Sequence, residues 1–126
     1  MSYGCLLPSE SAENYLEAIL VIRSRRGCCR NVDIANLLGI SKSSVTKALS
    51  NLSAEGLAEV VARDVRLTPE GGRVANSIRE RHRFFEKMLL EAGVDVETAS
   101  AEACRMEHCL SEDSFKKLSE SLGGEA

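Results

Sequence analysis

The sequence predicts a mainly α-helical protein with one short β-hairpin. Apolar residues recur at helical spacing along most of the 126 residues, and glycine, proline or a capping residue marks each point where one apolar pattern gives way to the next. Only residues 57–67 are rich in valine and broken by a polar pair, as expected for two short strands. A chain of this length suffices for one small domain with a helical extension.

The first two predicted helices are amphipathic. The first is expected over residues 9–26, with Ser9 or Ser11 as its cap, and Gly27 ends it. Asn31 can cap the second, and Gly39 can take the positive φ that ends a helix. Five residues form the apolar face of this second helix: Val32, Ile34, Ala35, Leu37 and Leu38.

A third helix starts almost at once, and its exposed face is small, polar and basic. Ser41 is a good N-cap for it. Its apolar positions, at i, i+3, i+4 and i+7, are Val45, Ala48, Leu49 and Leu52. The opposite face carries Lys42, Ser43, Thr46, Lys47 and Ser50.

The remaining elements follow in a simple order. Strands are expected at 57–61 and 65–67, joined by a turn at Arg63-Asp64. Thr68 caps the next helix and Pro69 is its first residue. That helix is expected to run to about Glu91, and two more follow at about 96–110 and at 111–122, the last one capped by Ser111.

The second and third predicted helices, joined by a tight turn within residues 31–55, form a helix-turn-helix pattern. Three helices followed by a two-stranded ribbon is the winged-helix order. We therefore expect a winged helix-turn-helix DNA-binding domain. The candidate DNA contacts are Ser41, Lys42, Ser43, Ser44, Thr46 and Lys47 in the major groove, and Arg63 and Arg66 on phosphates. The alternative is an ordinary helical hairpin beside a solvated ribbon.

Charge and composition are consistent with this interpretation. The net charge is −3, yet residues 23–73 hold nine Lys or Arg against five Asp or Glu, as expected for a DNA-facing surface between acidic flanks. The sequence has no apolar run of membrane-spanning length and no signal peptide, so we expect a cytoplasmic protein. Five cysteines without an export signal predict reduced thiols.

Three helices each offer ligand-type side chains at helical spacing. They are Cys104, Glu107 and His108; His82 and Glu86; and Asn14 and Glu17. A thiol, a carboxylate and an imidazole at i, i+3 and i+4 lie on one helix face within reach of one cation. The alternatives are a solvated surface or an ion pair around His82 and a buried small residue at Cys104.

Several motifs resemble the diphtheria toxin repressor and manganese transport regulator family of metal-dependent transcription factors, in its short form without an SH3-like domain. They are Glu13–Glu17, Ser43–Lys47, Leu67–Gly71, Arg81–Arg83 and Glu102–His108. The resemblance implies a DNA-binding domain over 1–73 and a helical metal-binding and dimerisation domain over 74–126. By position, it implies one metal site at Asn14, Cys104, Glu107 and His108, and another at His82, Glu86 and Glu17.

The chain follows neither branch of the resembled family throughout. Cys104 matches the iron-responsive branch, Glu17 matches the manganese-responsive branch, and Asn14 matches neither. A thiolate with an imidazole and a carboxylate suits Fe²⁺ better than Mn²⁺. The expected cofactor is therefore a divalent ion, Fe²⁺ first and Mn²⁺ second.

These observations favour a homodimeric, metal-activated repressor of operator DNA rather than an enzyme. One alternative is a winged-helix regulator that senses thiol oxidation at Cys28, Cys29 or Cys104. Another is a winged helix that binds proteins and never meets DNA. A metal-dependent hydrolase is the third, and it would need an open coordination position and a general base that the sequence does not indicate.

Overall fold

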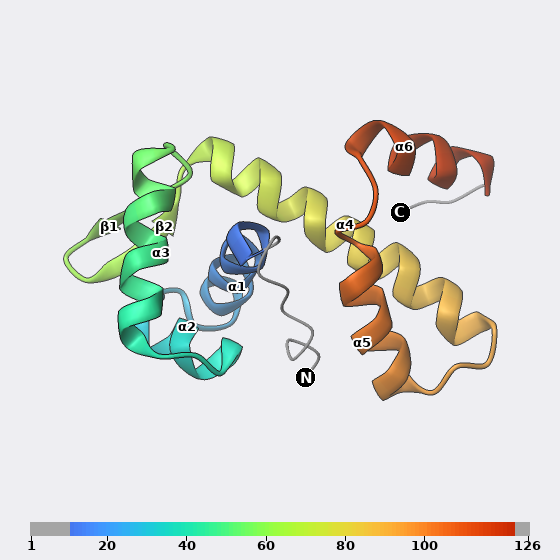
Figure 1. Cartoon of the computed structure of the whole chain (residues 1–126), viewed down its shortest axis with the longest axis horizontal. Coiled ribbons are helices and arrows are strands. Elements are labelled where there is room, and N and C mark those ends of the chain that lie inside the picture. Colours follow the sequence, from blue (N-terminus) through green and yellow to red (C-terminus); the bar gives the residue numbers. More distant parts are fainter. Residues whose placement is uncertain (1–10, 123–126) are drawn as a thin grey trace. The chain divides into compact units, whose positions relative to one another are not determined.

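The computed structural model describes residues 11–122, which form a mainly helical protein with one β-hairpin (Figure 1). Its elements are α1 (Ser11–Arg26), α2 (Asn31–Leu38), α3 (Lys42–Ala54), β1 (Ala58–Val61), β2 (Asp64–Leu67), α4 (Pro69–Glu91), α5 (Val96–Met106) and α6 (Glu112–Ser121). The described residues group into two compact units, divided between Asn76 and Ser77. The predicted winged helix-turn-helix is the first unit, and Ser9 lies outside the described residues.

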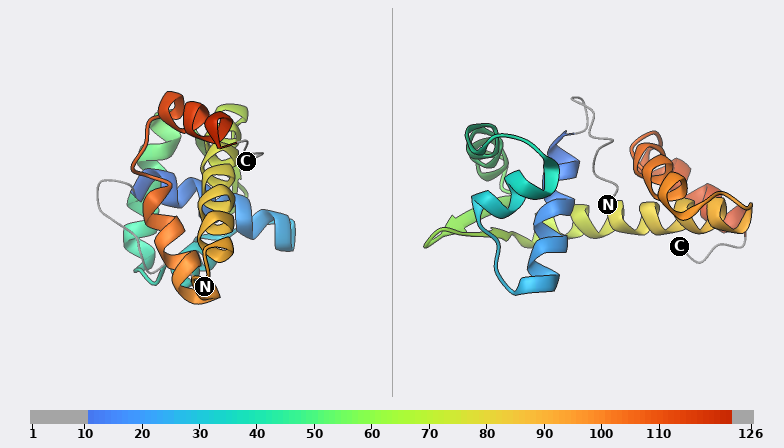
Figure 2. Two further views of the ribbon diagram at one scale, coloured as in Figure 1. Left: turned by 90° about the vertical axis from the view of Figure 1, so that its right-hand side faces the viewer. Right: turned by 90° about the horizontal axis from the view of Figure 1, so that it is seen from below.

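In the winged unit, α1 packs against α2, α3 and β2, and α3 packs against β1. One residue from each of four packing elements is essentially inaccessible: Ile19, Ile34, Val45 and Val65. The two strands form a ribbon that projects from the helices of this unit (Figure 2). Aliphatic side chains therefore supply most of this core.

The start of α2 differs from the prediction. Arg30 is the N-cap residue, and its backbone N–H donates to the Asp33 carboxylate at 2.9 Å. Asn31 is the first helical residue instead, and its side chain donates to Thr46 Oγ1 on α3 at 2.8 Å. Val32, expected on the apolar face, is 37 % exposed, whereas Ile34, Ala35 and Leu38 are buried. A cap was misassigned because Asn31 finds a better partner on the neighbouring helix.

The turn between α2 and α3 follows the prediction. Gly39 takes φ +70°, and its N–H donates to Ala35 O at 2.9 Å. Ser41 caps α3, since its hydroxyl accepts the N–H of Ser44 at 3.1 Å. Both features let the chain reverse within three residues.

The hairpin turn lies one residue earlier than predicted. Ala62 and Arg63 form it, with φ of 53° and 69°, and Asp64 is already the first residue of β2, paired with Val61. Two central residues with positive φ give the turn type whose twist matches that of paired strands. Neither residue is glycine, so the turn carries a conformational cost of about 1–2 kcal/mol per residue. The guanidinium of Arg63 consequently stands at the tip of the wing.

The N-terminus of α4 is tied to the residues that precede β1. Thr68 Oγ1 accepts the N–H of Gly71 at 3.0 Å, which confirms Thr68 as the cap, and donates to Gly56 O at 2.7 Å. A Cβ on Gly71 would lie 1.8 Å from the carbonyl oxygen of Leu57. Only glycine therefore fits where α4 passes the chain entering the wing.

In the second unit, α4, α5 and α6 enclose a small aromatic core. Phe84, Phe85 and Phe115 form three edge-to-face pairs, with ring centroids 5.3–5.9 Å apart. Ala103 of α5 is buried against them. Edge-to-face pairs add to the free energy gained by burying the rings, so three phenylalanines fix the arrangement of three helices.

The boundaries of α5 and α6 are set by caps. Asp95, which we did not predict as a cap, accepts the N–H of Thr98 at 3.1 Å. Ser111 caps α6 as predicted, accepting from Ser114 at 3.0 Å. The prediction that α5 continues to Leu110 is wrong, because it ends at Met106 and the N–H of His108 folds back to the carbonyl of Arg105.

Replacing Gly71 by alanine should destabilise the protein, by about 1–3 kcal/mol, because the backbone of Leu57 must move to make room. Gly72→Ala is the matched control: a Cβ there would meet no atom within 4 Å, and alanine favours the helix by up to about 1 kcal/mol. Urea unfolding of the two variants should give midpoints on opposite sides of the parent. Equal midpoints would contradict the close packing at Gly71.

Candidate metal centre and nucleic-acid interface

The carboxylate of Glu107 is the centre of a buried polar cluster in the helical unit. His82 of α4 places Nδ1 3.0 Å from Glu107 Oε1, and His108 places Nε2 3.2 Å from Oε2. The side chains are almost inaccessible, at 9 % for His82, 1 % for His108 and 0 % for Glu107. Glu107 therefore holds one imidazole at each of its two oxygens.

Two further side chains complete the cluster. Cys104, Glu107 and His108 each offer a ligand atom, and these atoms all lie within 4.8 Å of one another. On the other side, His82 Nε2 lies 3.6 Å from Glu86 Oε1, one helical turn along α4. Cys104, Glu107 and His108 lie close together as their spacing predicted, although Glu107 and His108 follow the end of α5. The contact between His82 and Glu107 joins the two predicted groups into one cluster.

The cluster fits a divalent cation chemically. It combines carboxylate, imidazole and sulfur donors, the ligand types that bind transition metals. A carboxylate withdrawn from water needs compensating positive charge, and here its neighbours are imidazoles, which bind metals when neutral. A cation shared by these groups would supply that charge.

The other two predicted ligands lie in the winged unit. Asn14 and Glu17 stand one turn apart on α1, and both are 1 % exposed. Carboxylate and amide side chains buried this deeply among apolar residues are unusual. Their role as ligands stays a prediction.

The cysteines differ from the expectation that all thiols are reduced. Cys104 is disulfide-bonded in this structure, and its sulfur becomes a thiolate ligand only after reduction. Cys28, Cys29 and Cys109 are free. Cys28 is exposed, whereas Cys29 is fully buried, and burial raises the pKa of its thiol to about 12. Such a thiol is a poor nucleophile, so Cys29 is unsuited to oxidation sensing.

All six residues predicted to enter the major groove are exposed in the helix-turn-helix: Ser41, Lys42, Ser43, Ser44, Thr46 and Lys47. Their hydroxyls are not equally available. That of Ser41 is engaged in capping α3 and in contacts with its neighbours, and Thr46 accepts from Asn31. Lys42 and Lys47 are the charged groups on this surface.

The two wing arginines have different surroundings. Arg66 Nε donates to Asp64 Oδ2 at 3.0 Å, so its charge is already paired. Arg63 is exposed at the tip of the wing and is in no ion pair within the described part of the chain. Arg63 is therefore better placed than Arg66 to meet a phosphate.

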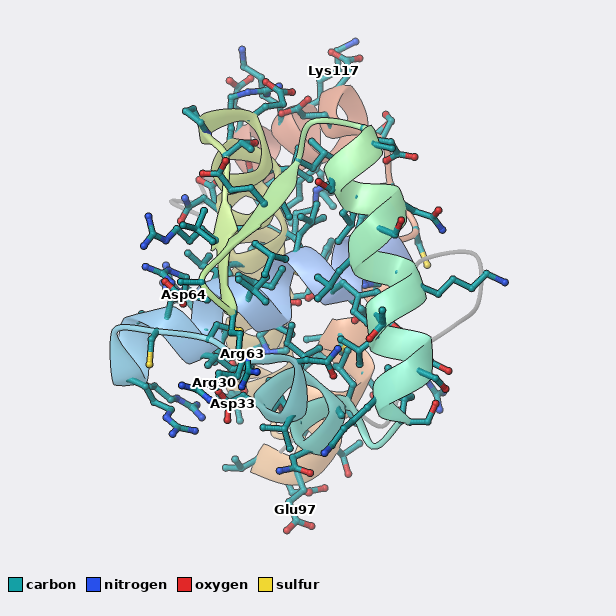
Figure 3. All side chains as sticks on the ribbon, turned by 90° about the vertical axis from the view of Figure 1, so that its left-hand side faces the viewer. Arg30, Asp33, Arg63, Asp64, Glu97 and Lys117 are labelled. Carbon is teal, nitrogen blue, oxygen red and sulfur yellow. The ribbon has the colours of Figure 1, made fainter. Side chains whose placement is uncertain are left out.

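Arg30 was not among the predicted DNA contacts. A groove in the winged unit is lined by residues of α2, α3 and the wing, and its cations are Arg30, Lys42 and Arg63. Its lining, among residues 11–122, contains no acid. Arg30 and Arg63 lie near one another where the wing meets the start of α2 (Figure 3). The sequence shows a cluster of arginines at 23–30 that could have suggested a DNA contact. Only the fold shows that Arg30 is the one that lines this groove.

The carboxylates near this groove form ion pairs with arginines that do not line it. Asp33 accepts from Arg26 at 2.7 Å. Asp64 Oδ1 accepts from the N–H of Cys29 at 2.9 Å and from Arg23 at 2.8 Å. These hydrogen bonds, with that of Arg66, lower the pKa of the Asp64 carboxyl from 3.8 to about 2. Asp64 thereby fastens the wing to α1 and to the chain before α2.

Comparison with known proteins identifies the class to which this arrangement belongs. Residues 8–64 match the family model described as iron dependent repressor, N-terminal DNA binding domain. Residues 68–124 match the model described as iron dependent repressor, metal binding and dimerisation domain. The fold and site thus define a metal-dependent transcriptional repressor, which is not an enzyme.

Individual relatives agree with the family models. The chain is 39 % identical over 118 residues to the transcriptional regulator MntR of Escherichia coli O6:H1, covering 90 % of this chain and 76 % of that protein. It superposes on the T. acidophilum IdeR structure with a TM-score of 0.76 and 30 % identity, covering 88 % of this chain and 53 % of the other. A manganese-dependent transcriptional repressor in complex with manganese gives a TM-score of 0.78 and 27 % identity, covering 89 % and 52 %. The chain spans about half the length of these two solved chains.

The chain belongs to the iron dependent repressor family, the family of diphtheria toxin repressor and MntR-type regulators that its motifs resemble. Its cofactor is a divalent metal. None of the helices described between residues 11 and 122 has the length and apolar character needed to cross a bilayer.

Asp64→Asn should loosen the wing and destabilise the protein at neutral pH, because the uncharged amide is a weaker acceptor for the two arginines and the N–H of Cys29. The folded-state pKa of Asp64 is depressed, so its contribution is present above about pH 4 and is lost as the pH falls toward 2. Urea midpoints of parent and variant should therefore differ at pH 7 and converge near pH 2. Glu59→Gln, an exposed carboxylate on the same ribbon, is the control, and an equal pH-independent gap for both variants would contradict this role.

Proposed function

We propose that the chain is a repressor that binds operator DNA as a homodimer in the cytoplasm when Mn²⁺ occupies the cluster around Glu107. The observation that carries this proposal is the convergence of His82, Glu107 and His108 in one buried cluster beside Cys104. The family models that cover a DNA-binding domain and a metal-binding and dimerisation domain support it.

The metal ligands in this proposal are side chains of α4 and of the end of α5. Glu107 supplies a carboxylate, His82 and His108 supply imidazoles, Cys104 supplies a thiolate when reduced, and Glu86 stands beside His82. A divalent ion held by these residues would supply the positive charge that the buried carboxylate lacks. Asn14 and Glu17 stay predicted ligands, on the resemblance alone. The proposed domain division is 1–73 and 74–126, and the two matching models cover residues 8–64 and 68–124.

The choice of Mn²⁺ over Fe²⁺ depends on the complete donor set. The Cys104 sulfur placed Fe²⁺ first in the prediction from sequence. The cluster offers two carboxylates, those of Glu107 and Glu86, against one sulfur, and carboxylates suit Mn²⁺. Solved relatives described as a manganese regulator and as a repressor in complex with manganese support the same choice.

For DNA, we propose that the N-terminal turns of α3 enter the major groove and that the groove cations meet phosphates. Lys42 and Lys47 carry the charge on α3, and Arg63 and Arg30 extend it toward the wing and α2. Arg66 contributes mainly by its pairing with Asp64. The metal can favour the DNA-competent state only by binding that state more tightly, which for typical coupling amounts to about 1–3 kcal/mol.

A second function, thiol-redox sensing, has one supporting observation: Cys104 is disulfide-bonded in this structure. Oxidation of Cys104 would remove the softest ligand from the cluster. Operator binding that responds to peroxide but not to added or chelated metal would favour this second function. The buried thiol of Cys29 leaves Cys104 and Cys28 as the residues to examine.

Glu107→Gln should weaken Mn²⁺ binding by more than about 100-fold, the upper end of what loss of an outer-shell partner costs at metal sites. The amide lacks the charge that the cation needs and cannot accept at both ends from His82 and His108. Isothermal titration of the reduced protein with Mn²⁺, beside operator binding, measures the effect.

Glu102→Gln, an exposed carboxylate on the same helix, is the matched control and should bind Mn²⁺ like the parent. Cys104→Ser adds a test of metal identity: activation by Mn²⁺ should persist, while binding of the softer Zn²⁺ should weaken. Loss of Mn²⁺ activation in Cys104→Ser would show that the thiolate is essential and would overturn the assignment of Mn²⁺ to this donor set.

Arg30→Gln and Arg63→Gln should each weaken binding to operator and to random duplex alike, because a phosphate contact carries no sequence information. Each should also lower the slope of log K against log salt by about 0.9, the value for one phosphate contact on B-DNA. Arg25→Gln, which removes an equal exposed charge from the last turn of α1, should leave the slope unchanged. Identical slopes for all three variants would remove Arg30 and Arg63 from the interface.

A further inference from the structure

Arg81 is a buried cation beside the proposed metal site. Arg81 is 7 % exposed. Its guanidinium Nη1 donates to the backbone carbonyl of Glu107 at 3.0 Å and to that of Leu110 at 2.7 Å. Both carbonyls belong to the turn that joins α5 to α6. One side chain of α4 therefore holds both ends of the turn that carries Glu107 and His108.

The end of α5 explains why a cation is stable there. The last carbonyls of a helix lack intrahelical donors and carry the negative end of its dipole. The N–H groups of His108 and Cys109 fold back to Arg105 and Met106. The carbonyl of Glu107 is left for an external donor, and the permanently charged guanidinium of Arg81 provides one.

Arg81 and His82 are neighbours on α4, and together they hold Glu107 at two points. Arg81 takes its backbone carbonyl at 3.0 Å, and His82 Nδ1 lies 3.0 Å from its carboxylate. With its backbone and its side chain both fixed, Glu107 has little freedom to turn. Ligands already held in place lose less conformational entropy on binding.

The other side of Arg81 is anchored in the aromatic core. Its guanidinium carbon lies 5.8 Å from the ring centroid of Phe115, within the range of cation–π attraction. Phe115 in turn packs against Phe84 and Phe85. Arg81 therefore links the α5–α6 turn to the aromatic core formed by α4, α5 and α6.

We infer that Arg81 is a positioning residue for the metal site: it touches no metal, but it holds the α5–α6 turn so that Glu107 and His108 face His82. This inference rests on the proposed metal site. Lysine keeps the charge but lacks the planar guanidinium that lies over the Phe115 ring, and its ammonium is more strongly hydrated, so we expect it to replace arginine only in part.

The test compares Arg81→Met and Arg81→Lys with Arg83→Met, an exposed arginine two residues further along the same helix. We expect Arg81→Met to raise the Mn²⁺ concentration at half-saturation by about 10- to 100-fold, as for other outer-shell partners. For Arg81→Lys, this concentration should lie between those of the parent and of Arg81→Met. Saturating Mn²⁺ should restore operator binding in both. Arg83→Met should titrate like the parent.

Thermal unfolding with and without Mn²⁺ separates positioning from plain stability. A positioning role makes the rise in Tm caused by Mn²⁺ smaller at a fixed concentration, because that rise reports affinity. Loss of stability alone lowers both Tm values and leaves the rise unchanged, which would overturn the inference. If Arg81→Met does not fold, Arg81→Lys decides, and parental Mn²⁺ affinity in Arg81→Lys overturns the inference.

Failure of the proposed function gives a different pattern. If the parent protein itself binds no Mn²⁺, or if Glu107→Gln binds it as well as the parent, the proposed site is wrong and Arg81 has nothing to position. If the parent binds Mn²⁺ through Glu107 while Arg81→Met matches Arg83→Met, the site stands and only the role of Arg81 is wrong.

Discussion

The helical unit depends on one constraint: the Glu107 carboxylate, fully withdrawn from solvent, must find positive or proton-donating partners. His82 and His108 meet it at 3.0 and 3.2 Å, and Arg81 holds its backbone. A buried carboxylate surrounded in this way is costly to bury for stability alone, and apolar residues of similar size would pack as well. The arrangement makes physical sense as a site that a divalent cation completes.

The winged unit also depends on one carboxylate, but that carboxylate has permanent partners. There the carboxylate of Asp64 is partly exposed and permanently satisfied by Arg23, Arg66 and the N–H of Cys29, with a pKa lowered to about 2. It fixes the wing at any physiological pH without engaging Arg63 or Arg30. The Asp64 carboxylate thus has a structural role, whereas we propose the Glu107 carboxylate as the centre of a metal site.

Much of this could be predicted from the sequence, since it depends on local chemistry. Ser41, Thr68 and Ser111 cap helices as their positions indicated, and the i, i+3, i+4 spacing placed Cys104, Glu107 and His108 together. The errors share a different cause. Asn31 does not cap α2, because its side chain donates to Thr46 instead. The two predicted ligand groups form one cluster, because the turn after Met106 brings Glu107 to His82. Arg30 and Arg81 were missed because their partners are distant in sequence.

The most direct measurement of the central claim is pulsed electron paramagnetic resonance of the reduced protein loaded with Mn²⁺, comparing unlabelled protein with protein containing ¹⁵N-histidine. We expect nitrogen couplings to the Mn²⁺ spin that change with the histidine label, because our proposal places the ion at the carboxylate that His82 and His108 flank. A spectrum without histidine couplings, like that of the hydrated ion, would contradict the assignment of the metal to this cluster.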